Sequence, residues 1–137
     1  MLFLYLFKIF LSIDGDRIGK ILEQYILDEK LEELSDFSKS IKKHVTDFVD
    51  IIEQNGGHVY MDGGDNLFAS IENDYIDKIV KYVKEKNMRN QYTFSIGLGS
   101  NISDTYLALK YAKSNGFKGK CILLVRNDRN DVEFKVL

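Results

Sequence analysis

The chain has 137 residues, a net charge of −2 and an apolar fraction of 45%. These values are typical of one soluble globular domain, and we expect residues 1–137 to fold as a single unit. The near-neutral charge excludes a global basic surface that would hold a long nucleic acid. The single cysteine, Cys121, excludes an internal disulfide and fits a reducing compartment. Its apolar neighbours predict a buried strand residue.

The first seven residues are apolar but do not form a signal peptide. Lys8 breaks the run, no basic segment precedes it, and Asp14 follows where a small-residue cleavage site would stand. The run is also shorter than the roughly 20 apolar residues that span a bilayer. We therefore expect a buried central strand over residues 3–13, no membrane insertion and a cytoplasmic location.

After this strand the sequence changes to a helical period. Apolar side chains recur every three or four residues over 18–26 and again over 31–52, which predicts two helices. Gly56 and Gly57 predict a C-terminal cap for the second helix.

A hairpin is predicted next, with strands over residues 58–62 and 67–71 around a glycine pair. Apolar residues at helical spacing then predict a third helix over 76–83. A run of β-formers predicts another strand over residues 92–98.

Ser103 or Asp104 is expected to cap a fourth helix, which runs to Asn115 and ends at Gly116. Two final strands form a last hairpin: residues 121–126 and 132–136. The order βααββαβαββ predicts an α+β fold, namely a ferredoxin-like antiparallel sheet with helices packed mainly on one face.

Two acidic turns contain the candidate catalytic residues. Asp14 ends a buried strand, where a lone carboxylate is costly, and Asp65 stands at the tip of the predicted hairpin. If the hairpin pairs beside the first strand, these two carboxylates and the Gly15 carbonyl face one cation. Mg²⁺ commonly takes one or two carboxylates and completes its shell with water and phosphate oxygens. We therefore predict Asp14 and Asp65 as catalytic residues of a Mg²⁺ or Mn²⁺ site; the alternative is that both segments are ordinary turns.

Phosphate-binding groups accompany these acids. The helix after Asp16 offers free N–H groups at its N-terminus, and lysines three apart on the fourth helix share one face. On spacing alone, a solvated lysine face is the alternative. His44 and His58 lack a partner at metal-ligand spacing and are expected to be structural. Besides Gly15, the predicted nucleotide-binding residues are Asp16, Arg17, Ile18, Gly19, Gly63, Gly64, Lys110 and Lys113.

Taken in order, these motifs resemble the palm domain of the GGDEF cyclases and type III CRISPR polymerases. The segment over residues 103–116 resembles that family's final helix, read as A-D-x-A-L-x-x-A-K-x-x-G. The other matching segments are Asp14-x-Asp16, Gly63-Gly64-Asp65-Asn66 and Ser95-Ile96-Gly97-Leu98.

Within this superfamily, the start of the chain is closest to the CRISPR polymerases. Residues 13–19 match their D-G-D-x-x-G better than the D-x-D-x-F-K of diguanylate cyclases, whose guanine-recognising Asn/Asp pair is not evident. A palm without further CRISPR domains resembles the minimal CRISPR polymerases, found beside membrane-associated effectors in anti-phage systems. The resemblance implies that homodimers join ATP into cyclic adenine dinucleotides or short cyclic oligonucleotides. It also implies that Asp14, Asp65 and the Gly15 carbonyl bind metal, while Lys113 holds the triphosphate.

The chain departs from that family at Asn66, where a second acid is common. The neutral amide removes one negative charge from a second metal site. Asp16 and Asp62 are the candidates to compensate, although a regular strand would point Asp62 to the other face. Two other functions stay open: a GTP cyclohydrolase-like or nucleotide hydrolase activity on the same fold, and a non-catalytic nucleotide-binding sensor.

Overall fold

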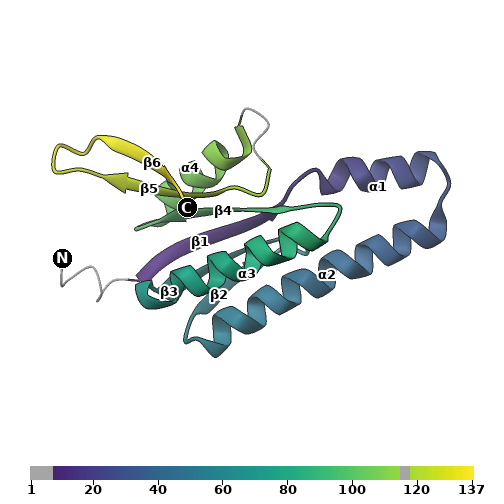
Figure 1. Cartoon of the computed structure of the whole chain (residues 1–137), viewed down its shortest axis with the longest axis horizontal. Coiled ribbons are helices and arrows are strands. Elements are labelled where there is room, and N and C mark those ends of the chain that lie inside the picture. Colours follow the sequence, from purple (N-terminus) through teal and green to yellow (C-terminus); the bar gives the residue numbers. More distant parts are fainter. Residues whose placement is uncertain (1–7, 115–117) are drawn as a thin grey trace.

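The computed structural model describes residues 8–114 and 118–137, which form a six-stranded sheet and four α-helices (Figure 1). The strands are β1 (Lys8–Gly15), β2 (His58–Asp62), β3 (Asn66–Glu72), β4 (Phe94–Gly99), β5 (Cys121–Arg126) and β6 (Val132–Val136). The helices are α1 (Ile18–Leu27), α2 (Leu31–Gln54), α3 (Ile76–Arg89) and α4 (Ile102–Lys113), with a 3₁₀ turn, η2 (Asn73–Tyr75), before α3. The predicted α+β class and element order are confirmed.

Strand β1 lies inside the sheet, whose order is β2-β3-β1-β4-β5-β6. It pairs antiparallel with both β3 and β4, so its C-terminal end stands next to the β2–β3 hairpin. Strands β4 and β5 are parallel, unlike the antiparallel pairing that we expected there. The reason is that α4 connects them, and a crossover helix returns the chain in its original direction.

The two faces of the sheet are covered unequally. Helices α1, α2 and α3 enclose the main core, where Phe94, Ile96 and Leu98 of β4 are buried. Helix α4 lies on the opposite face over β4 and β5 and encloses a smaller core (Figure 1). The helices are therefore mainly on one face, as predicted.

Helix α4 approaches β4 closely because the strand has glycine on that face. A Cβ atom at Gly97 would lie 2.4 Å from the Leu109 backbone nitrogen and 2.6 Å from the Thr105 carbonyl oxygen. A Cβ atom at Gly99 would meet the Thr105 nitrogen at 2.7 Å. The alternation of apolar residues and glycines in β4 thus gives one face to the core and the other to the α4 backbone.

The ends of several elements differ from the predictions. Residues 3–7 of the expected first strand lie outside the described residues, and β1 continues to Gly15. Strand β4 begins at Phe94 rather than Tyr92. The Tyr92 ring is buried before the strand, and its hydroxyl bonds Ser40 and His44 on α2, which gives His44 a structural contact.

The N-cap of α4 is Asn101, whose Oδ1 accepts a hydrogen bond from the Asp104 amide at 2.8 Å. Neither predicted cap residue, Ser103 or Asp104, takes this position. The Asp104 carboxylate instead pairs with Arg126 on β5. The predicted end of this helix at Asn115 and Gly116 lies outside the described residues.

The described residues include no helix that is both long enough and apolar enough to cross a lipid bilayer.

We predict that Gly97→Ala destabilises the protein by about 1–3 kcal/mol, because the added methyl group meets the α4 backbone and the helix must move. Urea denaturation measures the change. Gly19→Ala is the matched control, since a Cβ atom there has no neighbour within 4 Å. Equal stability of the Gly97→Ala variant and the unmodified protein would contradict this packing.

Candidate active site

The end of β1 and the tip of the β2–β3 hairpin meet at one end of the sheet. Asp14 lies opposite Asn66 in the strand register, and the Gly15 amide donates a hydrogen bond to the Asp65 carbonyl at 3.0 Å. The Asp14 side chain is 28% exposed, and Asp65 is half-buried. Two acids 51 positions apart in the sequence are thus brought to the same end of the sheet.

Lys113, in the last turn of α4, reaches the same place. Its Nζ donates a hydrogen bond to the Gly15 carbonyl at 2.9 Å and lies 3.1 Å from carboxylate oxygens of both Asp14 and Asp16. The ammonium group therefore contacts three oxygens at the end of β1. The Gly15 carbonyl, a predicted metal ligand, accepts this hydrogen bond from Lys113.

Asp16 is buried, and protein donors surround its carboxylate. It accepts hydrogen bonds from the Thr93 and Ser95 hydroxyls and from the Gly119 amide, besides the contact with Lys113. These contacts tie the β1–α1 connection to β4 and to the segment before β5. The structure thus gives Asp16 a positioning role. Its partners Thr93 and Ser95 were not predicted as site residues, because Thr93 lies in no motif and Ser95 was matched only as part of a strand.

Negative charge is in excess around Asp14. Burial raises the pKa of Asp14 above its ordinary value, and the neighbouring charges of Asp65 and Asp16 raise it further. The hydrogen bond and the charge of Lys113 act in the opposite direction without cancelling these effects. A second cation beside Asp14 would relieve this repulsion.

The donor set fits a hard divalent cation. The carboxylates of Asp14 and Asp65 are the oxygen ligands that Mg²⁺ and Mn²⁺ favour. Within residues 8–114 and 118–137, no three His, Cys, Asp or Glu side chains gather into a metal-binding group. The protein therefore offers two carboxylates, and a Mg²⁺ ion would take its remaining ligands from water and phosphate.

Asn66 stands where a second acid was expected. Its Oδ1 atom is buried without a hydrogen-bond partner and lies against Gly63, where a Cβ atom would approach it to 2.2 Å. Leaving a buried acceptor unpaired costs about 1–3 kcal/mol. The site thus contains an acceptor whose hydrogen bond the protein does not supply.

A β-bulge, a side-chain hydrogen bond and a glycine with positive φ shape the tip of the β2–β3 hairpin. A β-bulge between Val59 and Met61 interrupts the alternation of β2, and the Asp62 carboxylate accepts a hydrogen bond from the Gly64 amide at 3.1 Å. Gly64 has φ of 93°, which explains why glycine is needed there. Because of the bulge, the alternation expected for a regular strand does not decide where Asp62 points, and its carboxylate lines a pocket.

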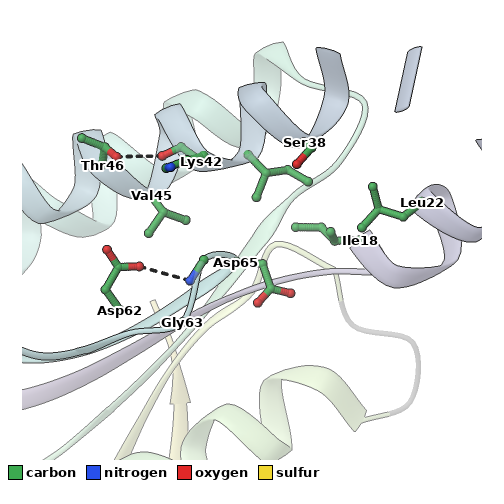
Figure 2. A pocket seen from close by; sticks show the side chains of 11 residues that line it. Ile18, Leu22, Ser38, Lys42, Val45, Thr46, Asp62, Gly63 and Asp65 are labelled. Atoms are coloured by element: carbon green, nitrogen blue, oxygen red, sulfur yellow. Dashed lines mark hydrogen bonds between the residues drawn. The ribbon is translucent and has the colours of Figure 1, made fainter. Parts of the chain in front are cut away.

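This pocket, of about 410 Å³, lies between α1, α2 and the hairpin, and Figure 2 shows the side chains that surround it. Apolar side chains from both helices form its walls: Ile18, Leu22, Ile41 and Val45. Its polar groups come from α2 and from the hairpin: Ser38, Lys42, Thr46 and residues 62–65. The α2 residues were missed, although Ser38, Lys42 and Thr46 recur every four positions beside the buried stripe of that helix.

The N-terminus of α1 borders the same region. Arg17 precedes the helix in the left-handed conformation, with φ of 61°, and its own side chain makes no capping hydrogen bond. A Cβ atom at Gly19 would have no neighbour within 4 Å among the described residues. The two predicted phosphate-binding lysines differ in position: Lys113 lies in the site, whereas the Lys110 ammonium lies over the Tyr106 ring, 5.4 Å from its centre.

An ion pair between a buried acid and an exposed arginine ties α4 to the sheet. The Asp104 carboxylate is buried and accepts two hydrogen bonds from the Arg126 guanidinium, at 2.8 and 3.0 Å. This bidentate contact fixes the N-terminal end of α4 to β5. Since Lys113 is on the same helix, the pair also helps to position the ammonium group in the site.

We predict that Arg126→Met lowers stability more at pH 7 than at pH 3. The hydrogen bonds of Arg126 lower the pKa of Asp104, so this carboxylate stabilises the fold above its unfolded-state pKa and loses the effect as pH falls through the folded-state value. In the variant, the same buried carboxylate lacks its partner and opposes folding when ionised. Urea denaturation at both pH values measures the difference, and a difference that is constant with pH would contradict the role of the pair.

We also predict that Asp14→Asn raises the melting temperature of the metal-free protein at pH 7. An acid whose folded-state pKa is raised disfavours folding above that pKa, and the amide removes the effect. The gain should shrink as pH falls toward the unfolded-state value, where both states bind the proton. Thermal unfolding in EDTA across pH 4–8 measures it; a variant that melts lower than the unmodified protein at pH 7 would show that contacts of the ionised carboxylate outweigh the repulsion.

Comparisons with known proteins identify the family and the fold. A family model described as a minimal CRISPR polymerase domain matches residues 10–123. A search of curated proteins finds no significant match.

Solved structures with the same fold are palm domains of nucleotide cyclases. The active GGEEF domain of a diguanylate cyclase from Vibrio cholerae superposes with a TM-score of 0.63 at 15% identity, covering 88% of this chain and 84% of that chain. The guanylyl cyclase domain of the RhoGC fusion protein from the aquatic fungus Blastocladiella emersonii superposes with a TM-score of 0.59 at 12% identity, covering 95% and 93%. The family match spans most of the chain and contains both acids and Lys113. The chain therefore belongs to the minimal CRISPR polymerase family and has the fold of the GGDEF and cyclase palm domains.

Proposed function

We propose that this protein is a metal-dependent nucleotidyltransferase that makes a cyclic di- or oligonucleotide from ATP. The observation that carries the proposal is that the end of β1, with Asp14, is hydrogen-bonded to the hairpin tip, whose Asp65 lines the pocket between α1 and α2. Carboxylates for a cation, an apolar cavity for a base and a lysine for phosphates lie within one end of the sheet. Family membership supports a polymerase- or cyclase-type reaction there.

The pocket supports binding of a purine base. Its apolar walls face one another across α1 and α2, and the hairpin with Asp65 closes one side (Figure 2). A base between these walls would direct its triphosphate toward the α1 N-terminus and Lys113. Backbone N–H groups at a helix start and a lysine ammonium are common phosphate ligands.

The polar groups of the pocket can bond either purine base. Ser38, Lys42 and Thr46 on α2, with the carboxylates of Asp62 and Asp65 on the hairpin, offer both donors and acceptors. We propose ATP as the substrate because residues 13–19 match the motif of the CRISPR polymerases better than that of the diguanylate cyclases.

The residues that would hold Mg²⁺ or Mn²⁺ are Asp14 and Asp65, with the Gly15 carbonyl as a further ligand once Lys113 turns to the phosphates. Such an ion lowers the pKa of an attacking hydroxyl and neutralises charge on the phosphate. The protein itself orients the two reactants. Lys113 binds triphosphate oxygens, and Asp16 positions Lys113 and the start of α1.

The reaction proposed is an in-line displacement at the α-phosphorus. A ribose hydroxyl oxygen of one nucleotide forms the new P–O bond, the bond to the bridging oxygen breaks, and pyrophosphate leaves. The hydroxyl proton passes to solvent. A second displacement of the same kind closes the ring.

Cyclisation of a dinucleotide favours a homodimer, since one palm presents one activated triphosphate. Family membership further supports a role in anti-phage defence in the cytoplasm, with a product-sensing effector protein that is itself membrane-associated.

Asn66 favours a second candidate function, a non-catalytic nucleotide sensor. The amide lowers the negative charge beside Asp14, so the protein would bind ATP with metal without turning it over.

We predict that the purified protein, incubated with ATP and Mg²⁺ or Mn²⁺, releases pyrophosphate and forms a cyclic adenine product. Mass spectrometry of reactions with each nucleotide triphosphate identifies product and base preference. Asp14→Ala or Asp65→Ala should reduce turnover by about a thousandfold, because a catalytic metal contributes several kcal/mol of transition-state stabilisation.

The control is Asp128→Ala, which removes an exposed acid in the β5–β6 turn, far from the site in the fold. It should leave turnover unchanged. ATP that binds but stays intact would support the sensor instead, and a ring-opened guanine product would support a cyclohydrolase. Full activity of the Asp65→Ala variant would rule out the two-carboxylate site.

A further inference from the structure

The α4 side of the sheet is only partly covered next to the candidate site. Helix α4 lies mainly over β4 and β5 and also contacts β1, and Phe10, Ser12 and Phe68 on this side are half-buried in the described part of the chain. Two rows of the register form the floor of this surface, Ser12 opposite Phe68 and Phe10 opposite Ser70; Ser70 is buried, and its hydroxyl forms a hydrogen bond with the Tyr60 hydroxyl. The Phe10 and Phe68 rings stack with their centres 6.0 Å apart.

Large exposed side chains form two walls beside this floor. Tyr60 and Met61 on β2 are 55% and 53% exposed, and Ile102 and Tyr106 on α4 are 64% and 55% exposed. A cavity of about 840 Å³ lies against Phe10 and the α4 wall. We call this surface the apolar trough and define it by Phe10, Tyr60, Met61, Phe68, Ile102 and Tyr106.

The charge of the trough limits what can cover it. Its two floor rows carry no formal charge, and charged residues appear only at the ends, at the Lys8–Glu72 row and at Asp14. A polynucleotide needs basic residues along its path, which the floor lacks. The cores of protein interfaces, in contrast, are depleted in charge and enriched in aromatic residues and Met.

The trough also leads to the site. Phe10, Ser12 and Asp14 alternate along β1 on one face, so a partner that covers the floor stands beside the Asp14 carboxylate. The pocket between α1 and α2 accommodates one base. Ring closure needs a second activated triphosphate, and the site of one chain is therefore incomplete by itself.

We propose that the apolar trough packs against the trough of a second copy of this chain, which brings the nucleotide that each site lacks. The inference rests on the proposed function and assigns the surface through which its dimer forms. A twofold interface requires one patch that complements itself. The trough meets this requirement, since it combines the exposed side chains of Tyr60 and Met61 on one side with the cavity beside Phe10, Ile102 and Tyr106 on the other.

Charge insertion into the walls tests the proposal. Tyr60→Glu and Tyr106→Glu change side chains that are more than half exposed, so the fold should persist, which thermal unfolding checks. Sedimentation equilibrium should give a dimer for the unmodified protein and a dissociation constant raised at least about 30-fold in either variant, the size of an interface hot spot. The matched control is Met88→Glu, an exposed apolar residue on α3 at the other side of the sheet, which should stay dimeric.

Disulfide cross-linking is a second test of the interface, and it does not depend on a measured dissociation constant. The native thiol is buried, and burial raises the pKa of Cys121 to about 12, so an introduced cysteine is the reactive one. Tyr60→Cys mixed with Ile102→Cys should give a disulfide-linked dimer on mild oxidation, because the walls of the two copies face each other. Met88→Cys should remain uncross-linked under the same conditions.

Three results would overturn the assignment: an unmodified protein that is monomeric while it makes product, Glu variants that both stay dimeric, and Glu variants that keep their dimeric mass but lose affinity for free adenosine. The third result would make the trough a base-binding surface. A dimer that the Glu variants dissociate, in a protein that forms no product, would uphold the surface and reject the proposed function.

Discussion

Helix α4 rests directly on β4, because Gly97 and Gly99 leave no side chain between the strand and the helix backbone. The rest of the site depends on this contact. The Asp104–Arg126 pair fixes one end of the helix to β5, and the other end delivers Lys113 to the end of β1. A helix held a few ångströms farther away would leave the buried Asp16 carboxylate without its cation, and burying an unpaired charge is among the costliest defects in a fold.

The end of β1 is assembled against electrostatic repulsion. Burial raises the pKa of Asp14, the charges of Asp65 and Asp16 raise it further, and Lys113 offsets these effects only in part. Such an arrangement costs folding free energy in the absence of a ligand, and it is a common property of sites that bind metal and phosphate. The same reasoning explains how Asn66 is tolerated: a further acid beside Asp14 would increase the repulsion, whereas the amide leaves one buried acceptor without a partner among the described residues.

Most of the fold follows from sequence periodicity, because long amphipathic helices and paired strands leave regular patterns. The two acids and Lys113 could also be predicted, since glycine-rich turns and the final-helix motif mark them. The remaining features depend on contacts between distant residues. Asn101 replaces the predicted cap because Asp104 is engaged by Arg126, twenty-two positions away. Asp16 was expected to face the ligand, yet donors from β4 and the segment before β5 surround it. The α2 side of the pocket has no motif and becomes visible only when the hairpin is placed against that helix.

The central claim is that Asp14 and Asp65 form one metal-dependent nucleotide site, and a binding measurement tests it without relying on turnover. Isothermal titration calorimetry would use an ATP analogue with a methylene group in place of the α–β bridging oxygen, in Mg²⁺ and in EDTA. The account predicts one analogue bound per chain in Mg²⁺, with affinity at least about tenfold weaker in EDTA or in the Asp65→Asn variant, a difference of 1.4 kcal/mol or more. Equal affinity under all three conditions would contradict it.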